Sequence, residues 1–90
     1  LFKTIDMSAF CGCTSLGSII IPESVDYIGV LAFAGCDSLK NVEIKNPSAI
    51  IGEYTPFSNG VERLIVPIGT FGWYSQFLVK YRDKIKEKGN

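Results

Sequence analysis

Apolar residues recur along this chain at a fixed interval of about 23 residues, a period typical of repeat proteins. The strongest copy is segment 9–16, AFCGCTSL, which returns as segment 32–39, AFAGCDSL, with six of eight positions identical. Further apolar positions keep the same interval: Ile5, Ile28 and Ile51; Phe10 and Phe33; Leu16 and Leu39; Ile19 and Val42; Ile21 and Ile44. This self-similarity predicts a repeat protein in which each copy is one structural unit.

Each copy contains a short pattern that is typical of a β-strand. Leu16-x-x-Ile19-x-Ile21 is rich in β-branched residues, alternates at its end and is closed by Pro22. The pattern returns twice, the second time with the interval shortened by one position: Leu39, Val42 and Ile44, then Val61, Leu64 and Val66. We expect these strands to pair in parallel as one sheet, with second extended stretches around 26–28 and 49–51.

A single repeat unit is too short to bury its own apolar side chains. Stacking successive units places equivalent side chains on one another, so that the core is shared between neighbours. The sequence therefore predicts about two and a half to three repeats over residues 1–68. Because Leu1 falls within a repeat, we expect a C-terminal piece of a longer chain. We expect the open N-terminal edge of this piece to be covered by neighbouring repeats of the longer chain or by a second copy of this chain.

The period ends after Pro67, and a helical pattern follows. Trp73, Phe77, Tyr81 and Ile85 are spaced by four, with Leu78 beside them. Thr70 is a candidate N-cap, Gly89 a candidate C-terminal stop, and basic residues gather near the end. We predict a helix over 70–88 in a capping segment, residues 69–90. Such a stripe can also bind a membrane or a partner helix, but a repeat stack needs a cap.

Composition and charge narrow the class of protein. Hydrophobic content of 47% argues against disorder, and no apolar run approaches the roughly 18 residues of a membrane helix. The net charge is zero, although residues 80–90 hold five basic and two acidic groups. This basic end is too short and too mixed for a nucleic-acid footprint. We expect neither membrane insertion nor a nucleic-acid partner.

The residues for catalysis are missing. The chain has no histidine, so neither a Cys-His nor a Ser-His nucleophile pair can be assembled. No lysine is placed beside a nucleophile by a recognisable motif. Gly29 and Gly52 recur one period apart and fit tight corners, and no phosphate-binding glycine motif precedes a helix. We predict no enzymatic activity and no cofactor.

The three cysteines allow several interpretations. Cys13 and Cys36 are one period apart, which favours buried thiols stacked in one column, and Cys11 aligns with Ala34 at a small site. A disulfide between Cys13 and Cys36 is the second interpretation. A zinc site is the third, although structural zinc usually takes four ligands with C-x₂₋₄-C spacing.

The strand pattern also predicts which side chains face outward. If Leu16, Ile19 and Ile21 point inward, the outer sheet face consists of Ser18, Ile20, Asn41, Glu43, Arg63 and Ile65. Ile20 and Ile65 are apolar where a polar residue is expected, and they flank Glu43. This face is the candidate protein-contact face. Scattered exposed apolar residues are also ordinary, so a face that binds nothing is the alternative.

The repeat resembles that of the BspA-like leucine-rich repeat proteins. The pattern is Ala-Phe-x-Gly-Cys-x-Ser-Leu followed by x-x-Ile-x-Ile-Pro-x-Ser-Val-x-x-Ile-Gly, and residues 9–29 match it throughout. Residues 32–52 depart from it, with Lys45, Pro47 and Ser48 where Pro, Ser and Val are usual. Val66-Pro67-x-Gly69-Thr70-x-x-x-Tyr74 resembles the segment that commonly ends such arrays.

The resemblance implies a right-handed, leucine-rich-repeat-like solenoid. It also implies membership of large secreted or surface-attached proteins, often of anaerobic bacteria, and therefore an extracellular or cell-surface location. Some members bind host matrix proteins such as fibronectin and fibrinogen and mediate adhesion. We therefore expect a non-enzymatic interaction module with a protein partner. The alternative is a structural cap or spacer at the end of a longer array, with no binding of its own.

Overall fold

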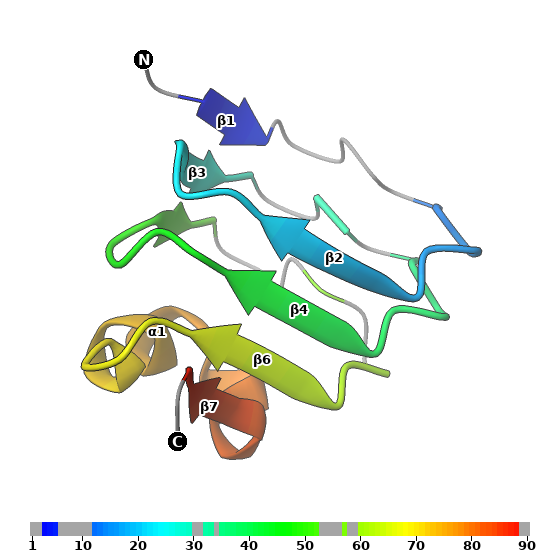
Figure 1. Cartoon of the computed structure of the whole chain (residues 1–90). Helices are drawn as coiled ribbons and strands as arrows, with labels where there is room; N and C mark the ends of the chain where they lie inside the picture. Colours follow the sequence, from blue (N-terminus) through cyan, green and yellow to red (C-terminus); the bar gives the residue numbers. More distant parts are fainter. Residues whose placement is uncertain are drawn as a thin grey trace.

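The computed structural model describes residues 3–5, 12–29, 32–33, 35–52, 57 and 60–88 of the chain. Seven short strands, one α-helix (α1) and one 3₁₀-helix (η1) follow one another in this part. In chain order they are β1 (Lys3–Ile5), β2 (Ser18–Ile21), β3 (Val25–Ile28), β4 (Asn41–Ile44), β5 (Ile50–Ile51), β6 (Arg63–Val66), α1 (Phe71–Phe77), η1 (Val79–Lys84) and β7 (Ile85–Glu87) (Figure 1).

The strands form two parallel sheets. One sheet has the order β2-β4-β6-β7 and the other β1-β3-β5. Residues of β2 pair with their equivalents one repeat later in β4, as Ile19 does with Val42, and Val42 pairs in turn with Leu64 of β6. The predicted strands and their parallel pairing are therefore confirmed. The second extended stretches, at Val25–Ile28 and Ile50–Ile51, pair with each other in the three-stranded sheet.

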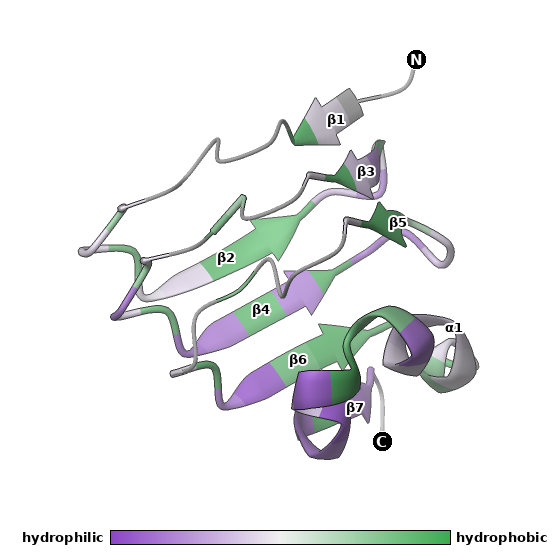
Figure 2. Ribbon diagram, turned by 180° about the vertical axis from the view of Figure 1, so that it is seen from behind, coloured by the Kyte–Doolittle hydropathy of each residue, from purple (hydrophilic) through white to green (hydrophobic). Residues whose placement is uncertain are grey.

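The core lies between the two sheets. Strand residues alternate between the core and the outside, so that along β4 Val42 and Ile44 are buried while Asn41 is exposed. Figure 2 shows this alternation as green and purple segments along β4. Stacked equivalents such as Ile21, Ile44 and Val66 are each at most 1% exposed. Because each unit buries its side chains against the next, the core is one continuous cluster.

Three aromatic rings, from the turns and from η1, stack in a column inside the core. The rings of Phe33 and Phe57 are stacked with centroids 5.3 Å apart. Tyr81, in η1, continues the column and meets Phe57 edge-on at 6.2 Å. All three side chains are at most 3% exposed. Phe10, the predicted member one repeat earlier, lies outside the described residues.

The predicted helix over 70–88 is wrong in its extent. Only Phe71–Phe77 is α-helical; the chain then forms η1 and finally β7, which pairs with β6. The spacing by four of Tyr81 and Ile85 places both side chains in the core, but from a 3₁₀-helix and a strand. The edge of β6 would otherwise leave backbone groups unpaired, and pairing with β7 outweighs the local helical pattern.

α1 begins directly after Thr70, the predicted N-cap position, but the side chain of Thr70 does not cap the helix. The Thr70 hydroxyl donates instead to the carbonyl of Pro67 at 2.6 Å. The backbone N–H of Phe71 donates to Oε2 of Glu87 at 3.1 Å, so a carboxylate from β7 satisfies this helix end. α1 has no basic residue in its last turn. Gly89, the predicted stop, lies outside the described residues.

Two tyrosine hydroxyls and an indole attach the C-terminal segment to the preceding turns. The Tyr74 hydroxyl accepts the N–H of Ala49 at 3.0 Å and donates to the carbonyl of Asn46. The Trp73 indole donates to the Ala49 carbonyl at 2.8 Å, and the Tyr81 hydroxyl donates to the Phe57 carbonyl. Burial raises the pKa of Tyr74, and the hydrogen bond with the backbone of Ala49 offsets part of this increase. Burial also raises the pKa of Tyr81, to about 12.

Replacing Phe33 by alanine removes the ring stacked on Phe57. We expect a loss of about 3–5 kcal/mol in the free energy of unfolding, as for other fully buried aromatic side chains. Urea denaturation followed by circular dichroism measures the change. Ile20→Ala is the matched control, because Ile20 is 60% exposed and its truncation should cost less than about 0.5 kcal/mol. Equal losses in the two variants would contradict the aromatic column.

Tyr81→Phe should change how stability depends on pH. The folded protein holds the phenol proton more tightly than the unfolded chain, since the pKa is about 12 instead of 10.0. The stabilisation from this group is therefore fully present below about pH 10 and is lost as the pH rises towards 12. We expect the unfolding free energy of the wild type to fall more steeply over this interval than that of Tyr81→Phe. Lysine titration is common to both proteins, so parallel curves would show that Tyr81 carries no such coupling.

Candidate protein-contact face

The six residues predicted to face outward do lie together on the outer face of the four-stranded sheet. Strand register arranges them in two rows that cross the strands. The first row is Ser18, Asn41 and Arg63, and the second is Ile20, Glu43 and Ile65. The first row is exposed throughout, whereas in the second Ile20 is 60% exposed and Glu43 and Ile65 are half-buried. Their arrangement on one face follows from the alternation of side chains along each strand.

β7 extends this face by one strand, which the sequence prediction missed. Lys86 pairs with Ile65 in the register of the sheet, so it is the fourth member of the second row. It is exposed, while its neighbour Ile85 is buried. The alternation of Ile85, Lys86 and Glu87 was the available signal in the sequence. This alternation covers only the short strand. The spacing by four of the apolar residues, which favours a helix, was the stronger pattern over the same residues.

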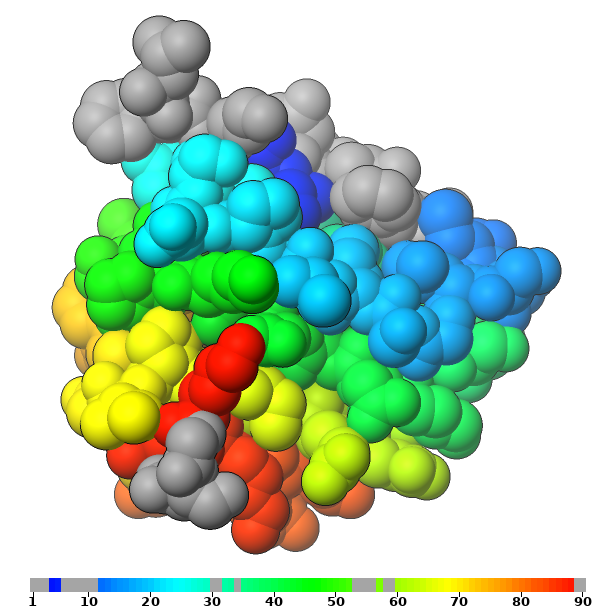
Figure 3. Space-filling view, in the orientation of Figure 1, coloured from blue at the N-terminus to red at the C-terminus, as the bar shows by residue number. Residues whose placement is uncertain are grey.

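An ion pair spans the face. Nζ of Lys88 lies 2.8 Å from Oε2 of Glu43, so the chain after β7 reaches over β6 to β4. Figure 3 shows the red C-terminal segment extending over the neighbouring strands. The Lys88 side chain is 62% exposed, so this pair contributes little to stability. It places the Lys88 ammonium beside Glu43 and offsets the charge of that carboxylate. Arg63 and Lys86 form no ion pair with any residue that the structure describes.

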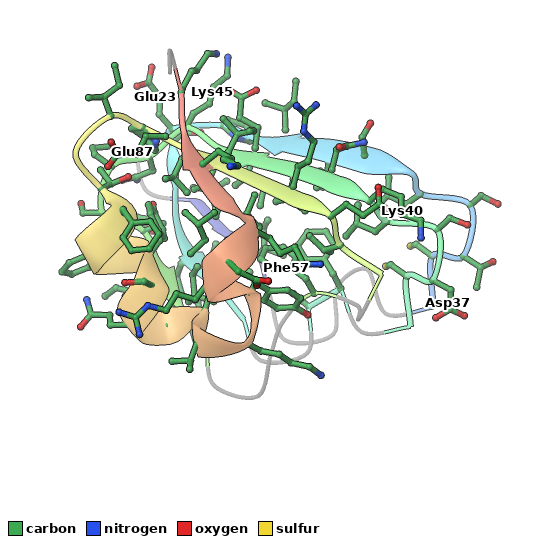
Figure 4. The ribbon with its side chains drawn as sticks, turned by 90° about the horizontal axis from the view of Figure 1, so that it is seen from below. Glu23, Asp37, Lys40, Lys45, Phe57 and Glu87 are labelled. Atoms are coloured by element: carbon green, nitrogen blue, oxygen red, sulfur yellow. The ribbon has the colours of Figure 1, made fainter. Side chains whose placement is uncertain are left out.

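A groove lies beside β7, with a volume of about 750 Å³. Three cationic side chains line it: Arg63, Lys86 and Lys88. The remaining lining residues are Ile65, Phe71, Ile85 and Glu87. Figure 4 shows Glu87 beside the first turn of α1, consistent with its hydrogen bond to the Phe71 N–H. A smaller hollow of about 210 Å³, lined by Glu23, Glu43, Lys45 and Lys88 among others, lies at the other end of the ion pair.

The opposite sheet also carries exposed apolar side chains. Tyr27 and Ile50 are register partners on β3 and β5, 37% and 50% exposed. Trp73 of α1 is 37% exposed, and its indole is bonded to the carbonyl of Ala49, the residue before Ile50. These residues were not predicted as a surface, although the alternation of exposed and buried positions applies to both sheets. They provide a matched comparison for the contact face.

Cys13 and Cys36 lie on the core side of the fold. Cys36 is buried and Cys13 is half-buried, and no disulfide joins them. Cys11 lies outside the described residues. Across the described ranges, no group of three or more His, Cys, Asp or Glu residues could hold a metal ion. Within the same ranges, no helix is both long enough and apolar enough to cross a membrane.

Comparison with known proteins gives one result. No curated protein and no solved structure shows a significant match to the chain. A family model, described as "BspA type Leucine rich repeat region (6 copies)", matches residues 2–71. The matched region includes every strand from β1 to β6 and ends at the first residue of α1. Because the match covers well over half of the sequence, the chain belongs to the BspA-type leucine-rich repeat family.

Proposed function

We propose that this chain is a non-enzymatic protein-interaction module that binds its partner through the outer face of the four-stranded sheet. The observation that carries the proposal is the registered row of Ile20, Glu43, Ile65 and Lys86. Two isoleucines are held in one line on a surface where polar residues are expected. Membership of a leucine-rich repeat family supports a protein-binding role.

A sheet face suits this role for a physical reason. Paired parallel strands fix the backbone, so binding has little conformational entropy to overcome. Ile20 offers a large exposed apolar side chain, and the polar first row of Ser18, Asn41 and Arg63 lies two positions along each strand. Two isoleucines beside polar and charged groups resemble the mixed apolar and polar composition of a protein interface.

The finer proposal is adhesion. We infer an extracellular or cell-surface module whose partner is a host extracellular matrix protein. The support is the family assignment, since BspA-type repeats are typically surface-associated. Self-association through the outer edges of β1 and β2 is a further proposal, because among the described strands each of these two has a partner on only one side.

A second candidate function is a structural cap without binding of its own. We propose residues 69–90 as this cap, following repeats over residues 1–68. The supporting observation is the docking of the segment on the last turns through Tyr74 and Tyr81, whose hydroxyls satisfy buried backbone groups. β7 also occupies the edge of β6.

Substituting Ile20 and Ile65 by lysine tests the contact face. We expect the wild-type chain to bind immobilised fibronectin or fibrinogen saturably. Ile20→Lys/Ile65→Lys should lose most of this binding, because it replaces both apolar side chains of the row by charged ones. Surface plasmon resonance measures the binding, and circular dichroism verifies that the variant is folded. The unfolding free energy should change by no more than about 0.5–1 kcal/mol, since the lysine stems can cover the same surface.

The matched control is Tyr27→Lys/Ile50→Lys, which places two lysines at register partners on the other sheet. We expect this variant to bind as the wild type does. Equal loss of binding in the two double variants would contradict the assignment of the face. A wild-type chain that binds neither matrix protein would favour the structural cap.

Tyr74→Phe tests the cap. The substitution leaves the buried N–H of Ala49 and the carbonyl of Asn46 without the hydroxyl that bonds to both. We expect a loss of about 1–3 kcal/mol in unfolding free energy, measured by urea denaturation, with binding to a partner unchanged. Phe71→Ala, which removes a 37% exposed ring in the same helix, is the control and should cost less. A stability equal to that of the wild type would mean that the hydroxyl does not hold the segment in place.

A further inference from the structure

The side chains that line the groove beside β7 carry an excess of positive charge. Of its lining residues, Arg63, Lys86 and Lys88 are cationic and only Glu87 is acidic. The Glu87 carboxylate is engaged by the N–H of Phe71. Lys88 is paired with Glu43 across the sheet. Arg63 and Lys86 therefore remain as the two cations with no ion pair among the described residues.

The strand register sets the distance between the Cα atoms of Arg63 and Lys86. Arg63 lies on β6, and Lys86 is the register partner of Ile65, two positions further along β6. From the ordinary dimensions of a sheet, their Cα atoms are about 8 Å apart, diagonally across one strand spacing. Alternate residues of an extended chain are about 7 Å apart and lie on the same side. Two carboxylates at alternate positions of an extended segment match these cations.

The rest of the lining is apolar. Ile65 lies next to Lys86 in the register, and Phe71 is 37% exposed at the start of α1. Ile85 is only 6% exposed at the base of the groove. A groove with both cationic and apolar lining is a poor match for an inorganic anion, because the apolar side chains would stay in contact with water. A peptide segment with both acidic and apolar side chains satisfies both parts.

We propose that the groove binds an extended acidic segment of the protein partner, with carboxylates at two alternate positions on Arg63 and Lys86. An apolar side chain at the next alternate position, on the same side of the segment, lies against Ile65 and Phe71. The proposal rests on the proposed function, since it names the chemistry of the partner at one end of the contact face. The guanidinium of Arg63 can accept a carboxylate in bidentate geometry, while the ammonium of Lys86 acts as a compact charge. The bound carboxylates complement these two charges, which have no ion pair within the described part of the chain.

A labelled peptide tests the proposal on the intact chain. The probe, called the Glu-Val peptide, is a fluorescein-labelled decapeptide in which Glu, Glu and Val occupy three successive alternate positions and Ser occupies the others. Its binding is measured by fluorescence anisotropy at several salt concentrations. We expect binding that weakens as salt rises and that falls by about tenfold or more in Arg63→Glu/Lys86→Glu. The same decapeptide with Lys in place of both Glu residues should not bind.

The matched control is Arg82→Glu/Lys84→Glu. It also reverses one arginine and one lysine, and neither residue lines the groove. We expect the control to bind the Glu-Val peptide within about twofold of the wild type. Equal weakening in both variants would overturn the proposal, because it would show attraction to overall charge. A heparin oligosaccharide that binds more tightly than the peptide, and equally well to Ile65→Asn, would also overturn it in favour of a sulfated carbohydrate.

Failure of this inference can be separated from failure of the proposed function with Ile20→Lys, because Ile20 does not line the groove. If matrix-protein binding is lost in Ile20→Lys but unchanged in Arg63→Glu/Lys86→Glu, the contact face stands and the acidic-segment proposal is overturned. If both variants lose binding while Arg82→Glu/Lys84→Glu retains it, the acidic segment and the face are supported together. If the wild type binds neither matrix protein nor peptide, both proposals are overturned.

Discussion

The structure depends on burial that is shared between neighbouring repeats. A single unit supplies only a few apolar side chains to each layer, and these reach full burial only when the next unit covers them. The column of Phe33, Phe57 and Tyr81 shows this most directly, since each ring is covered by its neighbours along the stack. The same dependence means that the last unit requires something to stack on it. The C-terminal segment meets this requirement with a tyrosine in the position of a phenylalanine.

The hydroxyl of that tyrosine distinguishes it from the two phenylalanines of the column. A phenylalanine would continue the apolar column, whereas Tyr81 adds a donor that reaches the carbonyl of Phe57. Tyr74 acts in the same way on the other side of the segment, through Ala49 and Asn46. Buried backbone groups in irregular turns are expensive to leave without partners. The terminal segment is therefore apolar enough to cover the core and polar enough to satisfy the turns.

The period of the sequence was sufficient to predict the repeated part of the fold. Ile19 with Val42, and Val42 with Leu64, occur as register partners because the interval between equivalent apolar positions, shortened by one in the last repeat, specifies the pairing. The outward positions of Ile20 and Glu43 followed from the same alternation. The contact face could thus be placed before the structure was known, although its role in binding stays a prediction.

The C-terminal segment could not be predicted in the same way. Tyr81 and Ile85 are spaced by four, which fits one face of a helix, but the edge of β6 selects a strand at Ile85–Glu87. Tertiary pairing with β6 determines this conformation, because the three residues of β7 together have no strong preference for a strand. The groove could not be predicted for the same reason, because Lys86 comes close to Arg63 only when β7 pairs with β6.

The short final strand also determines how the molecule meets other sheets. Any edge strand can pair with an edge from another molecule and so lead to aggregation. β7 has only the length of Ile85–Glu87, with Lys86 at its centre and Lys88 directly after it. Two such edges brought together would set like charges opposite one another, which is unfavourable. The C-terminal end of the sheet is thus protected against uncontrolled growth of one molecule onto the next.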